Sequence, residues 1–149
     1  MKKIILFFTL IVVCFACSKE KLYVYQNDFE LYLKEVHQLK ESDFEETIFY
    51  VLDIESCSCS ELNLKSLSML LTSNNLVLIT VGKSRIWENY KSKLNHFTIL
   101  EDPKGKVHRY ETGLGKPLLL HYRNQEIIYY QNVIDPEVAK ASAYILNPN

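Results

Sequence analysis

Two stretches of this sequence are apolar almost without interruption: residues 47–54 (TIFYVLDI) and residues 76–81 (LVLITV). A strand with one face in water alternates apolar and polar side chains, whereas a strand that is covered on both faces does not. The two runs therefore predict central strands of a sheet with helices on both sides. This requirement restricts the chain to an α/β architecture.

The segments around these runs alternate between helical and extended patterns. Apolar residues at spacings of three and four predict helices at about residues 28–40, 61–71, 85–94 and 136–146, with Asn27 or Asp28, Ser84 and Asp135 as their N-terminal caps. Short β-rich runs predict further strands at residues 22–25 and 97–100, and a hairpin of residues 118–122 and 126–130. Together they predict one mixed sheet that helices cover on both faces, with ligands gathering at the carboxyl ends of its parallel strands.

A pair of cysteines stands at one of those strand ends. Cys57 and Cys59 lie between the run 47–54 and the helix predicted from about Glu61. The free N–H groups and the positive dipole end of a helix N-terminus favour the thiolate, which is the form that attacks disulfides. A second thiol two residues away can close a disulfide, whose small ring would be strained and readily reduced. The plain alternative is two small residues near a helix cap.

The first residues are typical of a targeting segment. Lys2 and Lys3 precede a short apolar core at residues 4–13, which is shorter than the roughly 17–25 residues that span a bilayer. Ala16 precedes Cys17 as in a bacterial lipoprotein signal, although the residues upstream fit that signal loosely. We therefore expect residues 1–16 to be the signal peptide, Cys17 to carry lipid and residues 17–20 to form a tether. A cleaved secretory peptide or an uncleaved anchor are the alternatives.

This interpretation places the protein in the bacterial cell envelope, lipid-anchored on the periplasmic or outer-membrane side. That compartment is oxidising, and Cys57 and Cys59 would be the only free thiols of the mature chain. Loss of Lys2 and Lys3 leaves 15 basic side chains against 18 acidic ones. Because no basic cluster is interleaved with aromatic residues, nucleic acid is not expected as a partner. The remaining chain suits one compact domain.

The order of elements resembles the thioredoxin fold over nearly the whole mature chain, residues 21–149. Thioredoxin-like proteins carry a Cys-x-x-Cys motif after a central strand, and Cys57 matches its nucleophilic first cysteine. The segment 115–120 (GKPLLL) matches the family's cis-proline segment, with Pro117 as that proline. Residues 102–107 (DPKGKV) resemble a stretch of envelope thiol–disulfide oxidoreductases and peroxiredoxin-like proteins.

The sequence departs from this family at one important position. Ser60 stands where the family has its second, resolving cysteine. Either Cys59 has become the partner of Cys57, or Cys57 acts alone, or dithiol exchange has been lost. We expect Ser60 to cap the helix and to donate a hydrogen bond to the thiolate, and Lys116 to lower the pKa of Cys57 if its ammonium group reaches the sulfur. Pro117, as the family's proline, would dock an incoming peptide. An ordinary exposed lysine and a trans proline are the alternatives for the last two.

The leading prediction is thus thiol–disulfide exchange on thiols or disulfides of envelope proteins. Cys57 would be the nucleophile and Cys59 its possible partner, with neither a cofactor nor a metal. A non-catalytic binding or chaperone module of the same fold is the main alternative. A soft-metal site, such as copper at Cys-x-Cys, is a further one, although His37, His96, His108 and His121 are scattered along the chain.

Overall fold

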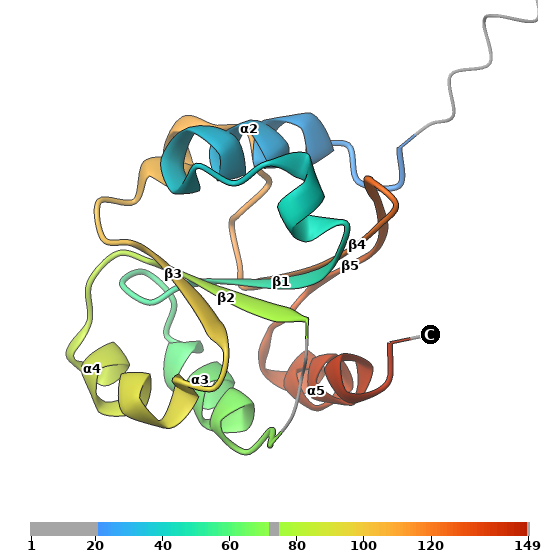
Figure 1. The fold of residues 1–149 in the computed structure, drawn as a ribbon. Coiled ribbons are helices and arrows are strands. Elements are labelled where there is room, and N and C mark those ends of the chain that lie inside the picture. Colours follow the sequence, from blue (N-terminus) through green and yellow to red (C-terminus); the bar gives the residue numbers. More distant parts are fainter. Residues whose placement is uncertain (1–20, 72–74, 149) are drawn as a thin grey trace, which may run out of the picture.

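The computed structural model of this protein describes residues 21–71 and 75–148. These residues form a single five-stranded sheet with helices on both faces (Figure 1). The strands are β1 (Glu46–Asp53), β2 (Leu76–Val81), β3 (Thr98–Asp102), β4 (Leu118–Arg123) and β5 (Glu126–Asn132). The α-helices are α2 (Gln26–His37), α3 (Ser60–Ser68), α4 (Arg85–Lys91) and α5 (Val138–Leu146), and the short 3-10 helices are η1 (Glu41–Phe44), η2 (Ser92–Leu94), η3 (Lys106–Arg109) and η4 (Asp135–Glu137).

The strand order is β3-β2-β1-β4-β5, so that β1 lies in the centre of the sheet. β1, β2 and β3 run parallel to one another, and β4 pairs antiparallel with both β1 and β5. Asp53 at the end of β1 is paired in register with Val81 at the end of β2. The carboxyl ends of the parallel strands therefore open at one edge of the sheet, as the sequence predicts.

One face of the sheet is covered by α2, which lies above it in Figure 1. Phe29, Tyr32 and Leu33 of α2 are fully buried and form one core cluster with Phe49 and Val51 of β1. The aromatic rings pack edge to face: those of Phe29 and Phe49 lie 5.6 Å apart at 77°. This is the geometry that aromatic pairs prefer, and it fixes α2 against the sheet.

The other face is covered by α3, α4 and α5, which lie below the sheet in Figure 1. Its core contains the alternate residues of β1, namely Ile48, Tyr50 and Leu52. They pack with Leu64 and Leu67 of α3 and with apolar side chains of the other two helices, including Trp87 and Ile145. Because successive strand residues point to opposite faces, one uninterrupted apolar strand supplies both cores.

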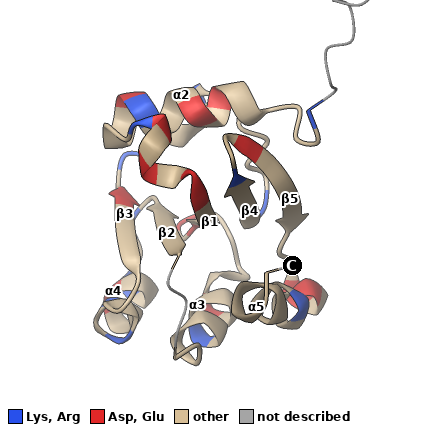
Figure 2. Cartoon of the chain, turned by 45° about the vertical axis from the view of Figure 1, so that its right-hand side comes forward, with Lys and Arg blue, Asp and Glu red and all other residues tan. Residues whose placement is uncertain are grey.

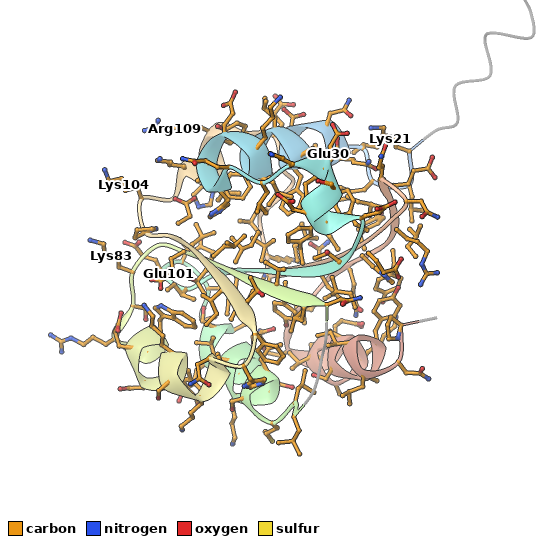
Figure 3. All side chains as sticks on the ribbon, in the orientation of Figure 1. Lys21, Glu30, Lys83, Glu101, Lys104 and Arg109 are labelled. Atoms are coloured by element: carbon orange, nitrogen blue, oxygen red, sulfur yellow. A yellow bond between two sulfur atoms is a disulfide. The ribbon has the colours of Figure 1, made fainter. Side chains whose placement is uncertain are left out.

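Charged residues lie mainly outside these two cores. Figure 2 shows both signs of charge on α2 and none on β2. In Figure 3 the labelled side chains of Lys83, Lys104 and Arg109 extend away from the body of the protein. Among the described residues, no helix combines the length and the apolar character needed to cross a bilayer.

The structure confirms β2 at the predicted residues and β1 to within one residue at each end, together with the final hairpin. Ser84 caps α4 as expected, because its Oγ accepts a hydrogen bond from the N–H of Ile86 at 3.2 Å. The predicted turn at residues 102–105 is also present, with Gly105 at a φ of +59°. The expected turn at residues 74–75 falls partly outside the described residues.

The expected strand at residues 22–25 is wrong. These residues form bends and turns that lead directly into α2, and the N–H of Gln26 donates to the carbonyl of Tyr23. Tyr23 alone among the four is buried, and its hydroxyl donates to the carbonyl of Thr112. One buried tyrosine therefore anchors this segment in a turn.

Two expected helix starts also differ. Asn27 and Asp28 lie inside the first turn of α2, whose N-cap is Tyr25 without a side-chain hydrogen bond. The segment that begins at Asp135 and Pro136 first forms η4 and becomes α-helical only at Val138. The N-cap of η4 is Ile134, so Asp135 is the first residue of this helix and Pro136 the second. Proline is tolerated in the first turn of either helix type, because its fixed φ suits both.

Candidate redox site

Cys57 and Cys59 form a disulfide immediately before α3, with their Cα atoms 5.2 Å apart. Cys59 is the N-cap of α3, and Ser60 is its first residue. The N–H of Cys59 also lies 3.2 Å from Sγ of Cys57 and donates to it. After reduction, this N–H and the positive end of the helix would favour negative charge on Cys57.

The loop before the cysteines is held by the side chain in which β1 ends. Oδ1 of Asp53 accepts hydrogen bonds from the N–H groups of Glu55 at 3.1 Å and Ser56 at 2.8 Å. Glu55 in turn accepts from the N–H of Lys83, after β2, at 3.3 Å. Gly82 adopts a φ of +84°, and a Cβ there would lie 2.7 Å from Glu55. The loop therefore fits closely against the end of β2.

Ser60 has a structural position under this loop. It is only 2% exposed, and its hydroxyl donates to the carbonyl oxygens of Asp53 at 3.0 Å and Cys57 at 2.7 Å. Among the described residues, its recorded partners are these carbonyls and not a sulfur atom. The expected hydrogen bond from Ser60 to the sulfur of Cys57 is thus absent from this oxidised form, and Ser60 closes the turn that carries the disulfide.

A second hydrogen-bond chain supports Cys59 from the core. The amide of Asn63 donates to the carbonyl of Cys59 at 2.8 Å, and the hydroxyl of Tyr50 donates to the amide oxygen of Asn63. Both side chains are buried, and burial raises the pKa of Tyr50, so that it remains a neutral donor. The position of Cys59 is therefore fixed by the central strand as well as by the helix.

The disulfide opens onto a cavity of about 490 Å³. Both cysteines line it together with Lys116 and Pro117, which come from the loop before β4. Lys116 is exposed, whereas Pro117 is buried. The structure thus brings together Cys57, Cys59, Lys116 and Pro117, four of the site residues predicted from the sequence. Ser60 is buried under the loop that carries the cysteines. Cys17, the expected lipidation site, lies outside the described residues.

Pro117 does not have the geometry that the family resemblance implies. The described residues contain no cis peptide bond, so the Lys116–Pro117 bond is trans. The carbonyl of Pro117 accepts a hydrogen bond from the N–H of Val133 at 2.7 Å, which extends the pairing of β4 with β5. This pairing fixes the carbonyl group of Pro117, which also lines the cavity as a residue.

Several cavity residues are not identified from the sequence. Asp53 lines the cavity. It is the only charged residue in the strand run 47–54, and this isolated charge could have marked it as a candidate from the sequence. The segment between β5 and α5 contributes Ile134, Asp135 and Pro136 to the cavity. The loop before β4 contributes Leu114. These residues are distant in sequence, so only the tertiary fold reveals them.

The histidines make separate contacts in different parts of the fold. Burial lowers the pKa of His121, which lies 2.8 Å from the hydroxyl of Tyr144. His108 contacts a cavity residue, since its Nε2 lies 3.3 Å from Oδ2 of Asp53. Among residues 21–71 and 75–148, no group of three side chains is arranged to hold a metal ion. Of the other two histidines, His37 contacts the hydroxyl of Tyr32 and His96 contacts the carbonyl of Leu70.

Comparison with known proteins supports the fold assignment. No protein family and no curated protein matches this sequence. Among solved structures, the chain is similar to a secreted Mycobacterium tuberculosis disulfide oxidoreductase homologous to E. coli DsbE, with a TM-score of 0.50 and 19% identity over 72% of this chain and 84% of the other. The mixed sheet and its helices are those of a thioredoxin-like fold, and the Cys-x-Cys pair lies at the start of α3.

Proposed function

We propose that this thioredoxin-like chain carries out thiol–disulfide exchange with proteins of the bacterial cell envelope, with Cys57 as the reacting sulfur and Cys59 as its partner. The observation that carries this proposal is a disulfide at a helix N-terminus that opens onto a cavity. The similarity to a secreted disulfide oxidoreductase supports it.

The reaction exchanges two electrons and two protons between the cysteine pair and a protein dithiol. A substrate thiolate attacks Sγ of Cys57, the Cys57–Cys59 bond breaks, and Cys59 leaves as a thiolate that takes up a proton. The second substrate thiolate then attacks the substrate sulfur of this mixed disulfide. The substrate disulfide is released, and Cys57 leaves as a thiolate that the N–H of Cys59 can stabilise. The same steps run in reverse when the substrate begins as a disulfide.

Ser60 favours a second candidate, a non-catalytic binding module. Its hydroxyl is buried and bonded to two carbonyl groups, so the position that carries the family's resolving thiol has a structural role here. In that case the cavity would hold a partner without any exchange of sulfur bonds.

Alkylation of the reduced protein across pH separates the two functions. We expect Cys57 to react with iodoacetamide faster than Cys59, with an apparent pKa well below the roughly 8.5 of a free thiol. The measurement is mass spectrometry of the labelled peptides of wild type, Cys57→Ser and Cys59→Ser. Equal, slow labelling of both thiols with ordinary pKa values would favour the binding module.

We further propose that Cys17 carries lipid and holds the domain at a membrane. The motive is the short apolar segment that ends at Ala16-Cys17. Replacing Cys17 with alanine should move the protein from the membrane fraction to the soluble fraction and remove the acyl mass. Cys14→Ala is the matched control, because Cys14 would be discarded with the signal. Unchanged membrane association of Cys17→Ala would contradict lipidation.

A further inference from the structure

Asp53 occupies an unusual place for a carboxylate. It ends the central strand β1, its side chain is only 13% exposed, and it lines the cavity onto which the disulfide opens. One oxygen, Oδ1, is used by the N–H groups of Glu55 and Ser56. An unneutralised negative charge beside two cysteines would disfavour the thiolate that exchange requires.

The second oxygen of this carboxylate contacts an imidazole ring. Nε2 of His108, on η3, lies 3.3 Å from Oδ2 of Asp53. The His108 side chain is 49% exposed, whereas the acid that it contacts is only 13% exposed. A Cβ at Gly105 would lie 3.2 Å from the His108 ring. The glycine turn before η3 thus leaves room for the ring.

We propose that Asp53 and His108 form a positioning pair of the redox site, in which the His108 imidazolium neutralises the carboxylate that faces the cysteine cavity. This inference rests on the proposed chemistry at Cys57. The carboxylate holds the loop that carries the cysteines. The positive charge of a protonated His108 reduces the repulsion between this carboxylate and the Cys57 thiolate, and so keeps the pKa of the thiol from rising. The pair acts through charge and does not form a bond with the substrate.

Other charged and titratable groups surround η3 and belong to the same electrostatic environment. Asp102 of β3 accepts a hydrogen bond from the N–H of Val107, and Tyr110, just after η3, donates to Glu35 of α2. Lys106 and Arg109 lie on η3 itself. Burial lowers the pKa of His37 on α2, and the charge of Lys106 contributes a smaller lowering. His108 differs from all of these because the residue that it contacts, Asp53, lines the redox cavity.

Matched substitutions in the full chain test the pair. Asp53→Asn keeps an oxygen that can accept from the loop N–H groups but removes the charge. His108→Gln keeps a polar side chain but removes the cation. The readout is the apparent pKa and alkylation rate of Cys57 in reduced protein, with iodoacetamide as the probe. Rates are compared at pH 6 and at pH 8, because a histidine side chain carries more positive charge at the lower pH.

We expect the two substitutions to act in opposite directions. His108→Gln should slow alkylation of Cys57 about threefold at pH 6, because it leaves Asp53 unneutralised, and should have less effect at pH 8. Asp53→Asn should speed alkylation by a similar factor at pH 8. The His108→Gln change should have a smaller effect in an Asp53→Asn background, since it acts through that carboxylate. His108→Lys should restore the wild-type rate at pH 6.

Several results would overturn the pair. They are a shift of Cys57 reactivity in the same direction in both variants, no shift in either, or a lower thermal midpoint with unchanged reactivity. Should either variant fail to fold, alkylation of wild-type Cys57 is measured at pH 6 and pH 8 with and without 1 M salt. Because salt screens charges, the pair predicts that the ratio of the two rates changes with salt, and an unchanged ratio would contradict it. The function itself fails separately, when Cys57 of the wild type reacts as an ordinary thiol although the variants still shift its rate.

Discussion

Replacing Cys59 with serine is expected to trap Cys57 in stable mixed disulfides with its protein partners. Cys59 is the nearest thiol that can break such a bond, because the two cysteines are joined in the structure and Ser60 has no sulfur. In this variant the mixed disulfide forms when the Cys57 thiolate attacks a substrate disulfide, and it persists until the substrate's own released thiolate or an outside thiol attacks it. The trapped species should appear as higher bands on non-reducing gels of envelope fractions and should collapse on reduction. Catalytic turnover with a reduced peptide dithiol should fall to background.

Cys57→Ser is the contrasting variant. It should lose turnover equally but trap nothing, because it lacks the sulfur to which the proposed reaction joins the substrate, and the remaining Cys59 serves only as that sulfur's partner. The double variant Cys57→Ser/Cys59→Ser controls for unspecific bands. Equal trapping by both single variants would contradict the assignment of Cys57 as the sulfur that bonds to the substrate, and trapping by neither would favour a binding module.

Truncating Phe49 to alanine should give the largest loss of stability, about 3–5 kcal/mol in the free energy of unfolding. Phe49 is completely buried in the central strand, and its ring packs against those of Phe29, Phe44 and Tyr122 at centroid distances of 5.6, 5.9 and 5.8 Å. Alanine would leave a cavity between α2 and the sheet that these rings cannot fill without moving. Urea unfolding followed by circular dichroism measures the change.

Two controls accompany this measurement. Phe49→Leu retains most of the apolar volume and should cost clearly less than alanine. Met69→Ala changes a side chain that is 63% exposed and should stay within about 0.5 kcal/mol of wild type. A loss below about 1 kcal/mol for Phe49→Ala would show that the α2 layer contributes little to folding. Alkylation of Cys57 in the folded variant would show whether the α2 layer also affects the redox loop.

The strands of the sheet were the most predictable part of the fold. Residues 76–81 form β2 at the predicted bounds, because an uninterrupted apolar run needs cover on both faces and only a central strand provides it. Residues 22–25 show the opposite case. Their β-rich composition predicts a strand, but the burial of Tyr23 and its hydrogen bond to Thr112 hold them in a turn. Composition alone does not distinguish an edge strand from an anchored loop.

The sequence by itself determined the α/β class and the position of Cys57 and Cys59 between a central strand and a helix. Both follow from local patterns: apolar periodicity along the chain and the order of strand, cysteines and helix. The tertiary structure decided which distant side chains meet those cysteines. Asp53 with His108 on η3, and Pro117 with Ile134, come together only because the sheet order β3-β2-β1-β4-β5 brings the ends of separate elements to one cavity. Such contacts depend on chain packing in three dimensions, for which one sequence carries no local signal.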